Sequence, residues 1–395
     1  SCGSEQSAQK TTMLVASISR IEMTPRQIWA ATVEDFDQDG DDDVFIGGHG
    51  QRHKDRIFYY DGERYQQGSF AFPYSKDRHA CAGADIDLDG DLDLYCSAGA
   101  NRGRGKKSNL LFKAVGVDGE YEKVTAFHGA EDAYGRGRFV RFLSADEDEY
   151  PDLLVTVWGE REDENRNASM LYRNDMERFT AVKTALPEEG GGRCLATLPS
   201  SNWPKLDDIV VCKGKKGASY YQNEGNYRFR EHPLPFQDSW WVAFETINRV
   251  STTPLVAGIV LNGGGGSLVV YDPKSLVAGD AEAILSRPIS TRADLRTTQC
   301  LAKAMAVADI NEDGHPDIFI TRVERSDRQQ ACEGDGDLLL LGPDYRQAQQ
   351  VKSVASGRSA WVYAANDHLL RLSGGERWEG DVEVIRFVKT TVSTR

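Results

Sequence analysis

Three observations predict an all-β fold, a seven-bladed β-propeller with four-stranded antiparallel blades. An acidic motif recurs along the chain, and short strand-like apolar runs flank each copy. The combined unit repeats with a period of about 47 to 60 residues. Four-stranded units at such a period are typical of propellers. The 395 residues leave room for seven units.

The acidic motif has the pattern D-x-[DN]-x-D-G-x-x-D. The full copies are DFDQDGDDD at 35–43, DIDLDGDLD at 85–93 and DINEDGHPD at 309–317, here called acid loops one, two and six after their units. Acid loop three, SADEDEYPD at 144–152, lacks the first Asp and the Gly, and a remnant, SSNWPKLDD, lies at 200–208. Two carboxylates ~4 Å apart repel by about 4 kcal/mol at an effective dielectric near 20. Such loops are therefore either solvated acidic turns or cation sites.

Each unit reads as strand, acid loop, strand, variable loop, strand, turn and strand. In the first unit, IWAATVE precedes the acid loop, VFIGG follows it, and RIFYY, the turn DGER and YQ come after a variable loop. The fifth unit keeps this rhythm without the acid loop, and the seventh lacks a fourth strand. The first strands are expected to begin near residues 27, 79, 137, 193, 240, 300 and 358.

The N-terminal segment from Thr11 to Ser19 alternates like a strand. We predict that it supplies the missing strand of blade seven, because closing the ring in this way removes an exposed sheet edge. Residues 1–10 would then form a flexible tether, and residues 11–395 a single propeller domain.

The acid loops differ from EF-hand loops, which need a Glu at position twelve between two helices. Position twelve here is Ile46, Cys96 or Ile320, and the flanking runs are strands. Calcium takes ~6 to 8 oxygen ligands. Positions one, three, five and nine can supply side-chain oxygens, and position seven its backbone carbonyl. We therefore expect β-hairpin calcium loops, in which the ion mainly stiffens the fold.

With these motifs, the sequence resembles the FG-GAP/VCBS repeat family of integrin α-subunit propellers and many bacterial surface and secreted proteins. The resemblance is strong in units one, two and six, partial in three, and faint in four, five and seven. It implies a seven-bladed propeller with calcium between the first and second strands of a blade. The implied ligands for about three ions are Asp35, Asp37, Asp39, Asp41, Asp43, Asp85, Asp87, Asp89, Asp91, Asp93, Asp309, Asn311, Asp313, His315 and Asp317, with an incomplete fourth set at Asp146, Asp148 and Asp152.

The cysteines bracket the loops. Cys81 lies four residues before acid loop two and Cys96 three after it, positions that face each other in an antiparallel hairpin. We predict three disulfides, Cys81–Cys96, Cys194–Cys212 and Cys300–Cys332, with buried free thiols as the alternative. Disulfides and extracellular-type calcium loops both indicate an oxidising, calcium-rich compartment. We expect a secreted or cell-surface protein.

The N-terminus carries one further cysteine, Cys2, in SCGSEQSAQKTT. This stretch resembles the start of a bacterial outer-membrane lipoprotein, although Ser1 precedes the cysteine. An intermolecular disulfide and an inert thiol are the alternatives. A glycosylation sequon begins at Asn167 and would be used only in a eukaryotic secretory route.

Composition excludes some partners and targeting segments. The formal charge of -14 disfavours nucleic acid, whose binding requires neutralising phosphates. No apolar stretch approaches the ~18 residues needed to cross a membrane. No signal peptide is present, so we expect a mature form.

Basic residues gather in the variable loops and at the starts of first strands, which share the face opposite the acid loops. We expect this face to bind an anionic ligand, an acidic glycan or an acidic protein surface, because clustered cations concentrate anions and Arg binds carboxylates bidentately. The alternative is a set of solvated loops. The candidates are Arg52, His53, Lys54, Arg56, His79, Arg102, Arg104, Lys106, Lys107, Arg136 and Arg138, with Lys76 and Arg78 beside them. Trp240 and Trp241 could stack on sugars, although core packing is the more ordinary role.

The sequence contains no G-x-S-x-G, H-E-x-x-H or phosphate-binding loop. The leading hypothesis is a non-catalytic, calcium-stabilised extracellular binding or adhesion propeller, within a surface assembly. The alternative is a polysaccharide lyase that neutralises a uronate with Arg and removes its α-proton with His or Tyr. That alternative would use His49, His53, His79, Tyr134 and Arg136.

Overall fold

The computed structural model describes the chain except for a set of loops and the two ends. The residues left out are 1–9, 24–27, 49–53, 74–77, 100–106, 117–118, 125–127, 134, 136, 158–168, 177, 185, 187–193, 214–215, 250–252, 263–264, 290–299, 325–335, 352–358, 375–379 and 394–395. None of the helices within the described residues has the length and apolar character that a membrane crossing requires.

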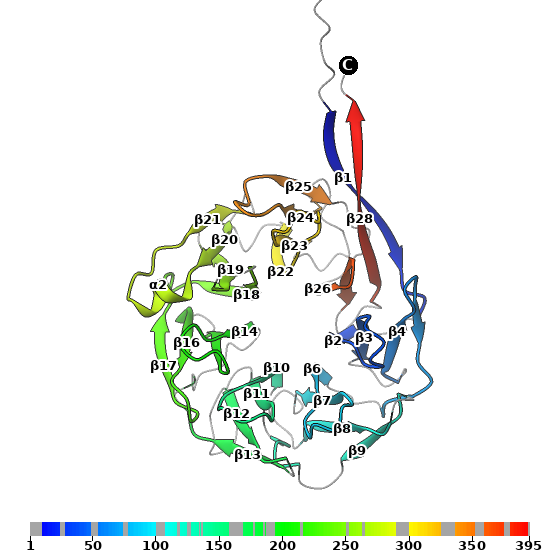
Figure 1. Ribbon diagram of the computed structural model, residues 1–395, viewed down its shortest axis with the longest axis vertical. Helices are drawn as coiled ribbons and strands as arrows, with labels where there is room; N and C mark the ends of the chain where they lie inside the picture. The colour runs from blue at the N-terminus through cyan, green and yellow to red at the C-terminus, as the bar shows by residue number, and fades with distance from the viewer. Residues whose placement is uncertain are drawn as a thin grey trace, which may run out of the picture.

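The described strands form seven sheets of four antiparallel strands, arranged as blades around a ring (Figure 1). Blade one contains β2 (Ile28–Glu34), β3 (Asp43–Gly48), β4 (Arg56–Tyr60) and β5 (Tyr65–Gln67). Blade two contains β6 (Arg78–Ala84), β7 (Asp93–Ala98), β8 (Leu110–Ala114) and β9 (Tyr121–Val124). Blade three contains β10 (Gly137–Leu143), β11 (Asp152–Val157), β12 (Ser169–Asn174) and β13 (Phe179–Val182). Blade four contains β14 (Leu195–Pro199), β15 (Asp207–Cys212), β16 (Ala218–Asn223) and β17 (Phe229–Pro233).

The remaining blades follow the same order. Blade five contains β18 (Trp240–Ile247), β19 (Leu255–Asn262), β20 (Gly265–Tyr271) and β21 (Leu285–Pro288), with the short helix α2 (Pro273–Val277) before its last strand. Blade six contains β22 (Cys300–Ala308), β23 (Asp317–Glu324), β24 (Asp337–Leu340) and β25 (Ala348–Val351). Blade seven contains β26 (Ser359–Ala365), β27 (His368–Gly374), β28 (Val382–Ser393) and, from the N-terminus, β1 (Lys10–Arg20). The predicted all-β seven-bladed propeller is confirmed.

The ring closes as predicted, because β1 is the outermost strand of blade seven. It pairs antiparallel with β28 from Lys10 opposite Ser393 to Arg20 opposite Glu383. Figure 1 shows that this two-stranded ribbon extends beyond the rim of the ring. Midway along it, Val15 lies opposite Val388, and both side chains are about half exposed.

The core lies between neighbouring blades. The second strands β3, β7 and β11 are buried at every position, because both faces of each blade are covered by its neighbours. Between blades one and two, Phe72 packs edge-on against Phe45 and Phe112, with ring centroids 5.2 Å apart in both pairs. Burying each large apolar side chain contributes about 1.5 to 3 kcal/mol.

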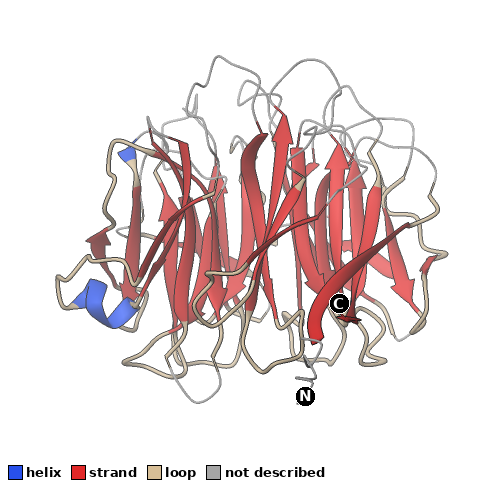
Figure 2. Cartoon of the chain, turned by 90° about the horizontal axis from the view of Figure 1, so that it is seen from above, coloured by secondary structure: helices blue, strands red, loops and turns tan. Residues whose placement is uncertain are grey.

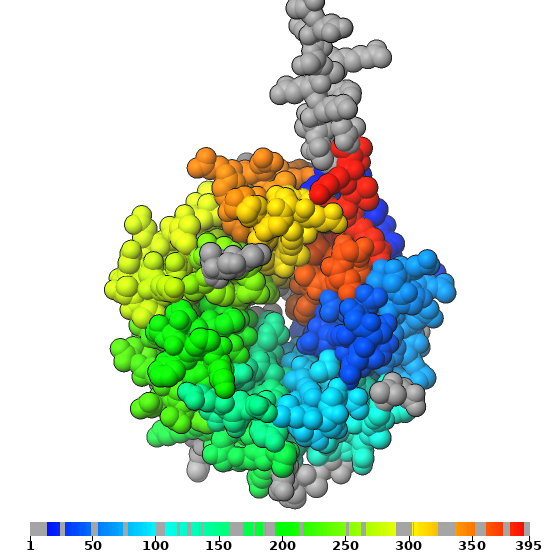
Figure 3. Space-filling model, in the orientation of Figure 1, coloured from blue at the N-terminus to red at the C-terminus, as the bar shows by residue number. Residues whose placement is uncertain are grey.

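The strands run across the thickness of the disc, so alternate connections emerge on opposite faces (Figure 2). The acid loops join first to second strands and therefore share one face, here called the acid-loop face. The connections between second and third strands emerge on the other, the variable-loop face. The innermost strands surround a narrow central opening (Figure 3).

Candidate functional site

Acid loops one and two each bring three carboxylates together. One oxygen from each of Asp35, Asp37 and Asp39 lies within 4.8 Å of the other two, and Asp85, Asp87 and Asp89 repeat the arrangement. Convergence of hard oxygen atoms at this spacing suits a calcium-sized cation.

The backbone of these loops explains the glycine in the motif. Position six is left-handed in loops one, two and six, with φ of 98° at Gly40, 100° at Gly90 and 85° at Gly314. A residue with a Cβ is strained there. Glu149 holds this position in loop three and has no left-handed φ, so loop three follows a different path.

Backbone amides within each loop hold the first and fifth carboxylates. Asp35 accepts a hydrogen bond from the amide of Gly40 (3.1 Å), and Asp39 accepts one from the amide of Asp41 (2.9 Å). Loop six repeats both bonds, from Gly314 to Asp309 (2.8 Å) and from His315 to Asp313 (2.9 Å). The side chains are thus oriented before any ligand arrives.

The ninth-position aspartates have a structural role that the motif did not reveal. Asp43 is fully buried, and its two oxygens accept the amides of Phe36 in the loop (3.0 Å) and Tyr60 at the end of β4 (2.8 Å). Burial raises the pKa of Asp43 to about 7, and the pKa values of Asp93 and Asp152 are raised similarly. This pair of hydrogen bonds to one buried aspartate, here called the bracket, joins the first, second and third strands of a blade.

The same bracket is present in blade four, where the acidic triad is lost, and in blade six, where Asn311 replaces one aspartate. In blade four, Asp208 accepts the amide of Asn223 (2.7 Å) and the hydroxyl of Tyr220. In blade six, Asp317 accepts the amides of Ile310 (3.0 Å) and Gly342 (2.8 Å). The ninth position therefore serves the blade whether or not its loop could hold a cation.

Buried carboxylate oxygens without a partner distinguish loops one and two. Among the described residues, Asp35 Oδ1, Asp37 Oδ1 and Asp87 Oδ1 are buried and have no hydrogen-bond partner. Burial, followed by the neighbouring Asp39 and Asp35 charges, raises the pKa of Asp37. A buried unpaired carboxylate is costly. The residues present therefore fit a hard divalent cation.

The other loops contain internal donors that partly replace a cation. In loop two, the ammonium of Lys113 forms an ion pair with Asp87, which raises the pKa of the lysine. In loop three, the hydroxyl of Tyr227 from blade four donates to Asp146 (2.7 Å) and Asp152 (3.2 Å). In loop six, the Asn311 amide donates to Asp313 (3.0 Å). Loop one is the most complete candidate.

The residue at the second position of each loop anchors the loop in the core, a role that the acidic pattern does not predict. Phe36 packs between blades one and two, Ile86 between two and three, and Ala145 between three and four. The available signal was the apolar residue at this position in an otherwise acidic motif. The loops are consequently rigid supports rather than free turns.

Side-chain bonds connect the loops around the ring. The Gln38 amide in loop one donates to the carbonyl of Gly90 in loop two. Asn174 of blade three donates to the carbonyl of Ile86 (2.7 Å), and Asn223 of blade four donates to that of Ala145 (3.1 Å).

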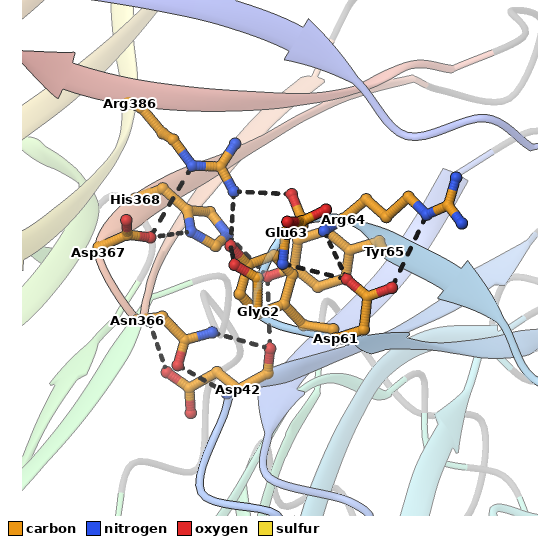
Figure 4. A network of polar contacts seen from close by, with 11 residues as sticks. Asp42, Asp61, Gly62, Glu63, Arg64, Tyr65, Asn366, Asp367, His368 and Arg386 are labelled. Atoms are coloured by element: carbon orange, nitrogen blue, oxygen red, sulfur yellow. Dashed lines mark hydrogen bonds and ion pairs between the residues drawn. The ribbon is translucent and has the colours of Figure 1, made fainter.

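Blade seven has no acid loop and joins loop one through its own turn (Figure 4). Arg386 donates to the hydroxyl of Tyr60 (2.7 Å), and His368 lies 2.8 Å from the hydroxyl of Tyr65. Burial lowers the pKa of His368, so it is held neutral near pH 7. The network fastens the closing blade to blade one.

Two of the three predicted disulfides are present. Cys81 pairs with Cys96 and Cys194 with Cys212, each linking facing positions of a first and a second strand. Cys300 begins β22, and its predicted partner Cys332 lies outside the described residues. Cys2 and Asn167 also lie outside them.

Most of the predicted basic face lies outside the described residues, namely Arg52, His53, Lys76, Arg102, Arg104, Lys106 and Arg136. Lys54 is exposed and Lys107 partly exposed. Arg56 is directed to its own blade, where it donates to the carbonyl of Ser69 (2.6 Å).

Three further basic residues are less accessible than the sequence suggested. Arg78 is fully buried and pairs with Asp55 of blade one at 2.8 Å, so it is a core residue. His79 and Arg138 are each only 8% exposed. Arg78 and His79 contact residues of blade one, which the strand pattern alone did not indicate.

The structure describes little of the suggested lyase constellation. His49, His53, Tyr134 and Arg136 lie outside the described residues, and Nδ1 of His79 accepts the indole N–H of Trp29. Trp241 is buried and stacks on Phe244 with ring centroids 4.9 Å apart, so it belongs to the core.

Comparison with known proteins matches one part of the chain to a repeat family. Residues 35–96, from acid loop one to the end of the hairpin around loop two, match the family model described as FG-GAP-like repeat. No curated protein matches the sequence. The chain is thus a seven-bladed propeller that contains an FG-GAP-like repeat, and this combination suggests a binding or adhesion-type domain.

Solved propellers share the fold at low identity. The chain is similar to BBS1N, in a crystal structure of its complex with ARL6DN soaked with mercury, at 10% identity and a TM-score of 0.57 over 94% of this chain and 96% of that one. It is also similar to the Dos1 propeller, at 10% identity and a TM-score of 0.50 over 87% and 75% of the two chains. At this identity the likeness concerns the fold alone.

Proposed function

We propose that this chain is a calcium-stiffened extracellular propeller that binds an anionic ligand on its variable-loop face. The observation that carries the calcium proposal is the pair of acidic triads whose buried oxygens lack partners. In loop one, Asp35, Asp37 and Asp39 would hold the ion, and the equivalent aspartates would do so in loop two. Loop six offers the same positions with Asn311 in place of one aspartate.

The two disulfides support an oxidising, extracellular location. Exposure of Lys54 and partial exposure of Lys107 on the variable-loop face support an anionic ligand there, since the chain as a whole is acidic. We favour an acidic glycan, and an acidic protein surface is the alternative occupant. The function is binding rather than catalysis, within an assembly at the cell surface.

The calcium proposal is tested by thermal unfolding of the full chain in EDTA and after adding back Ca²⁺ or Mg²⁺. Calcium should raise the melting temperature by several degrees more than Mg²⁺, because Mg²⁺ demands a tighter octahedral shell. D37N should lose part of this gain. D280N, which changes an exposed aspartate outside every acid loop, should retain it. Identical melting in EDTA and Ca²⁺ would contradict the proposal.

The ligand proposal is tested by surface-immobilised binding to uronate-rich and sulfated polysaccharides, with neutral dextran and an acidic protein as comparisons. Binding to the acidic polysaccharides should weaken steeply as salt increases. Binding of only the acidic protein would shift the assignment to a protein ligand. Absence of binding to every anionic probe would remove the proposed ligand class.

A further inference from the structure

The first strands share an irregularity near their starts. Within the described residues, five of the seven contain a register shift at this place, in β2, β6, β10, β18 and β22. The residue that the shift leaves over is Trp29 in β2, His79 in β6 and Arg138 in β10. Such β-bulges re-aim a side chain and are common beside binding sites.

The bulged residues of neighbouring blades meet at the inner rim of the ring. The ring of Trp29 lies 5.6 Å from that of His79 in the following blade and 6.3 Å from that of Trp361 in the preceding blade, centroid to centroid. The first strands β26, β2 and β6 of these three blades lie next to one another around the centre of the ring (Figure 1). All three residues stand near the beginnings of first strands, so this rim belongs to the variable-loop face.

The indoles of Trp29 and Trp361 meet at a steep angle, here called the corner, and part of their surface is accessible. Their planes meet at 75°, and both side chains are partly exposed. The N–H of Trp29 is donated to His79, which sets the plane of that ring. Among the described residues, the N–H of Trp361 has no hydrogen-bond partner. Indole N–H groups in folded proteins usually find an acceptor, so this one remains available to a ligand.

We propose that Trp29 and Trp361 form a subsite that stacks on a sugar ring of an acidic polysaccharide, at the mouth of the central channel. A pyranose presents apolar C–H faces to the indoles, and its hydroxyls can accept the N–H of Trp361. The acidic groups of the same polysaccharide would meet the positive charge proposed for the variable-loop face. This inference rests on the proposed anionic-glycan function and deepens it.

The test compares rim variants of the full chain in the polysaccharide assay. W29A and W361A should each bind uronate-rich chains about tenfold more weakly, whereas W361F, which keeps an aromatic face, should lose less. W203A is the matched control, because Trp203 is 47% exposed and lies on the acid-loop face. Melting temperatures of all variants verify that they fold.

The outcomes separate the subsite from the broader function. Weakened binding in folded W29A or W361A, with a smaller loss in W361F and unchanged W203A, supports the subsite. If every rim variant binds as tightly as the wild type, the subsite is overturned and the two indoles are core packing. The anionic-ligand proposal then still holds. A wild-type protein that binds no acidic polysaccharide overturns both.

Discussion

The backbone amide of Asn366 donates to the carboxylate of Asp42 (3.0 Å), and the side-chain oxygen of Asn366 accepts the amide of Asp42 (2.8 Å). The two residues are 324 positions apart and join the turn of blade seven to acid loop one. Asn366 is itself left-handed, with φ of 48°, a conformation that Asn tolerates better than most residues. Asn366 thus forms the turn of blade seven and also connects this blade to blade one by hydrogen bonds.

N366A should therefore destabilise the fold by about 1 to 3 kcal/mol, because it removes the acceptor of the Asp42 amide and strains the turn. Urea unfolding measures the change. N226A is the matched control: Asn226 has φ of 51° and is exposed, and no hydrogen bond joins its side chain to another blade among the described residues. Equal losses in both variants would show that only the turn conformation matters.

D208A should destabilise the chain by about 2 to 4 kcal/mol, because the amide of Asn223 and the hydroxyl of Tyr220 would lose a buried acceptor. Blade four has no acidic triad, so the number of bound calcium ions should not change. Equilibrium unfolding and a calcium titration measure the two quantities. A lost ion would mean that Asp208 belongs to a metal site instead.

K113M should strengthen calcium binding at loop two by about tenfold, because the ammonium that competes for Asp87 is removed while the apolar stem is kept. Calorimetric titration resolves this change. K123M alters an exposed lysine on the neighbouring strand β9 and should leave affinity unchanged. Unaltered binding in K113M would show that Lys113 does not compete with the ion.

E245Q should alter the pH dependence of stability. Glu245 on β18 interacts with Arg141 on β10, two blades away across the channel, and burial raises its pKa to about 7. The folded state thus holds this proton more tightly than the unfolded chain, whose value is near 4.5. The stability from this group is complete below pH 4.5 and declines as pH rises through 7.

The glutamine has no proton to lose, so E245Q should gain about 1 to 2 kcal/mol on wild type between pH 5 and pH 8. Chemical denaturation at a series of pH values gives the difference. E282Q, at an exposed site in the same blade, should follow the wild-type curve. Parallel curves for E245Q and wild type would contradict the assignment.

Removing a disulfide should lower stability by about 3 kcal/mol, the cost of releasing a loop of this size in the unfolded chain. C81A/C96A opens a separation of 15 residues and C194A/C212A one of 18, so the two losses should be similar. Guanidinium unfolding with and without reductant provides the measurement. Reductant that left the wild type unchanged would argue against both bonds.

The sequence was sufficient for the architecture because local signals agree there. Strand periodicity and the acidic turns predict seven first strands. The first of them was expected to begin near residue 27, and β2 begins at Ile28. The closing strand was also predictable, because the seventh unit lacks a fourth strand and the N-terminal segment is a strand that belongs to no other unit.

The site was predictable only in its local part. The triad of loop one follows from the spacing of Asp35, Asp37 and Asp39 within one turn. The bracket at Asp43 and the burial of Arg78 against Asp55 depend on segments that meet only in the folded blade. Similarly, no sequence pattern marks Trp29 and Trp361 as neighbours, since their blades adjoin only through ring closure.

The pairing of Lys10 with Ser393 also sets the order of events during synthesis on the ribosome. β1 is made early but cannot take its place until β28 has been made. Until then, β1 has no partner strand, and its edges remain open to other chains. Contacts of such long sequence separation fold slowly, so the propeller should be most vulnerable to aggregation just before β1 and β28 pair.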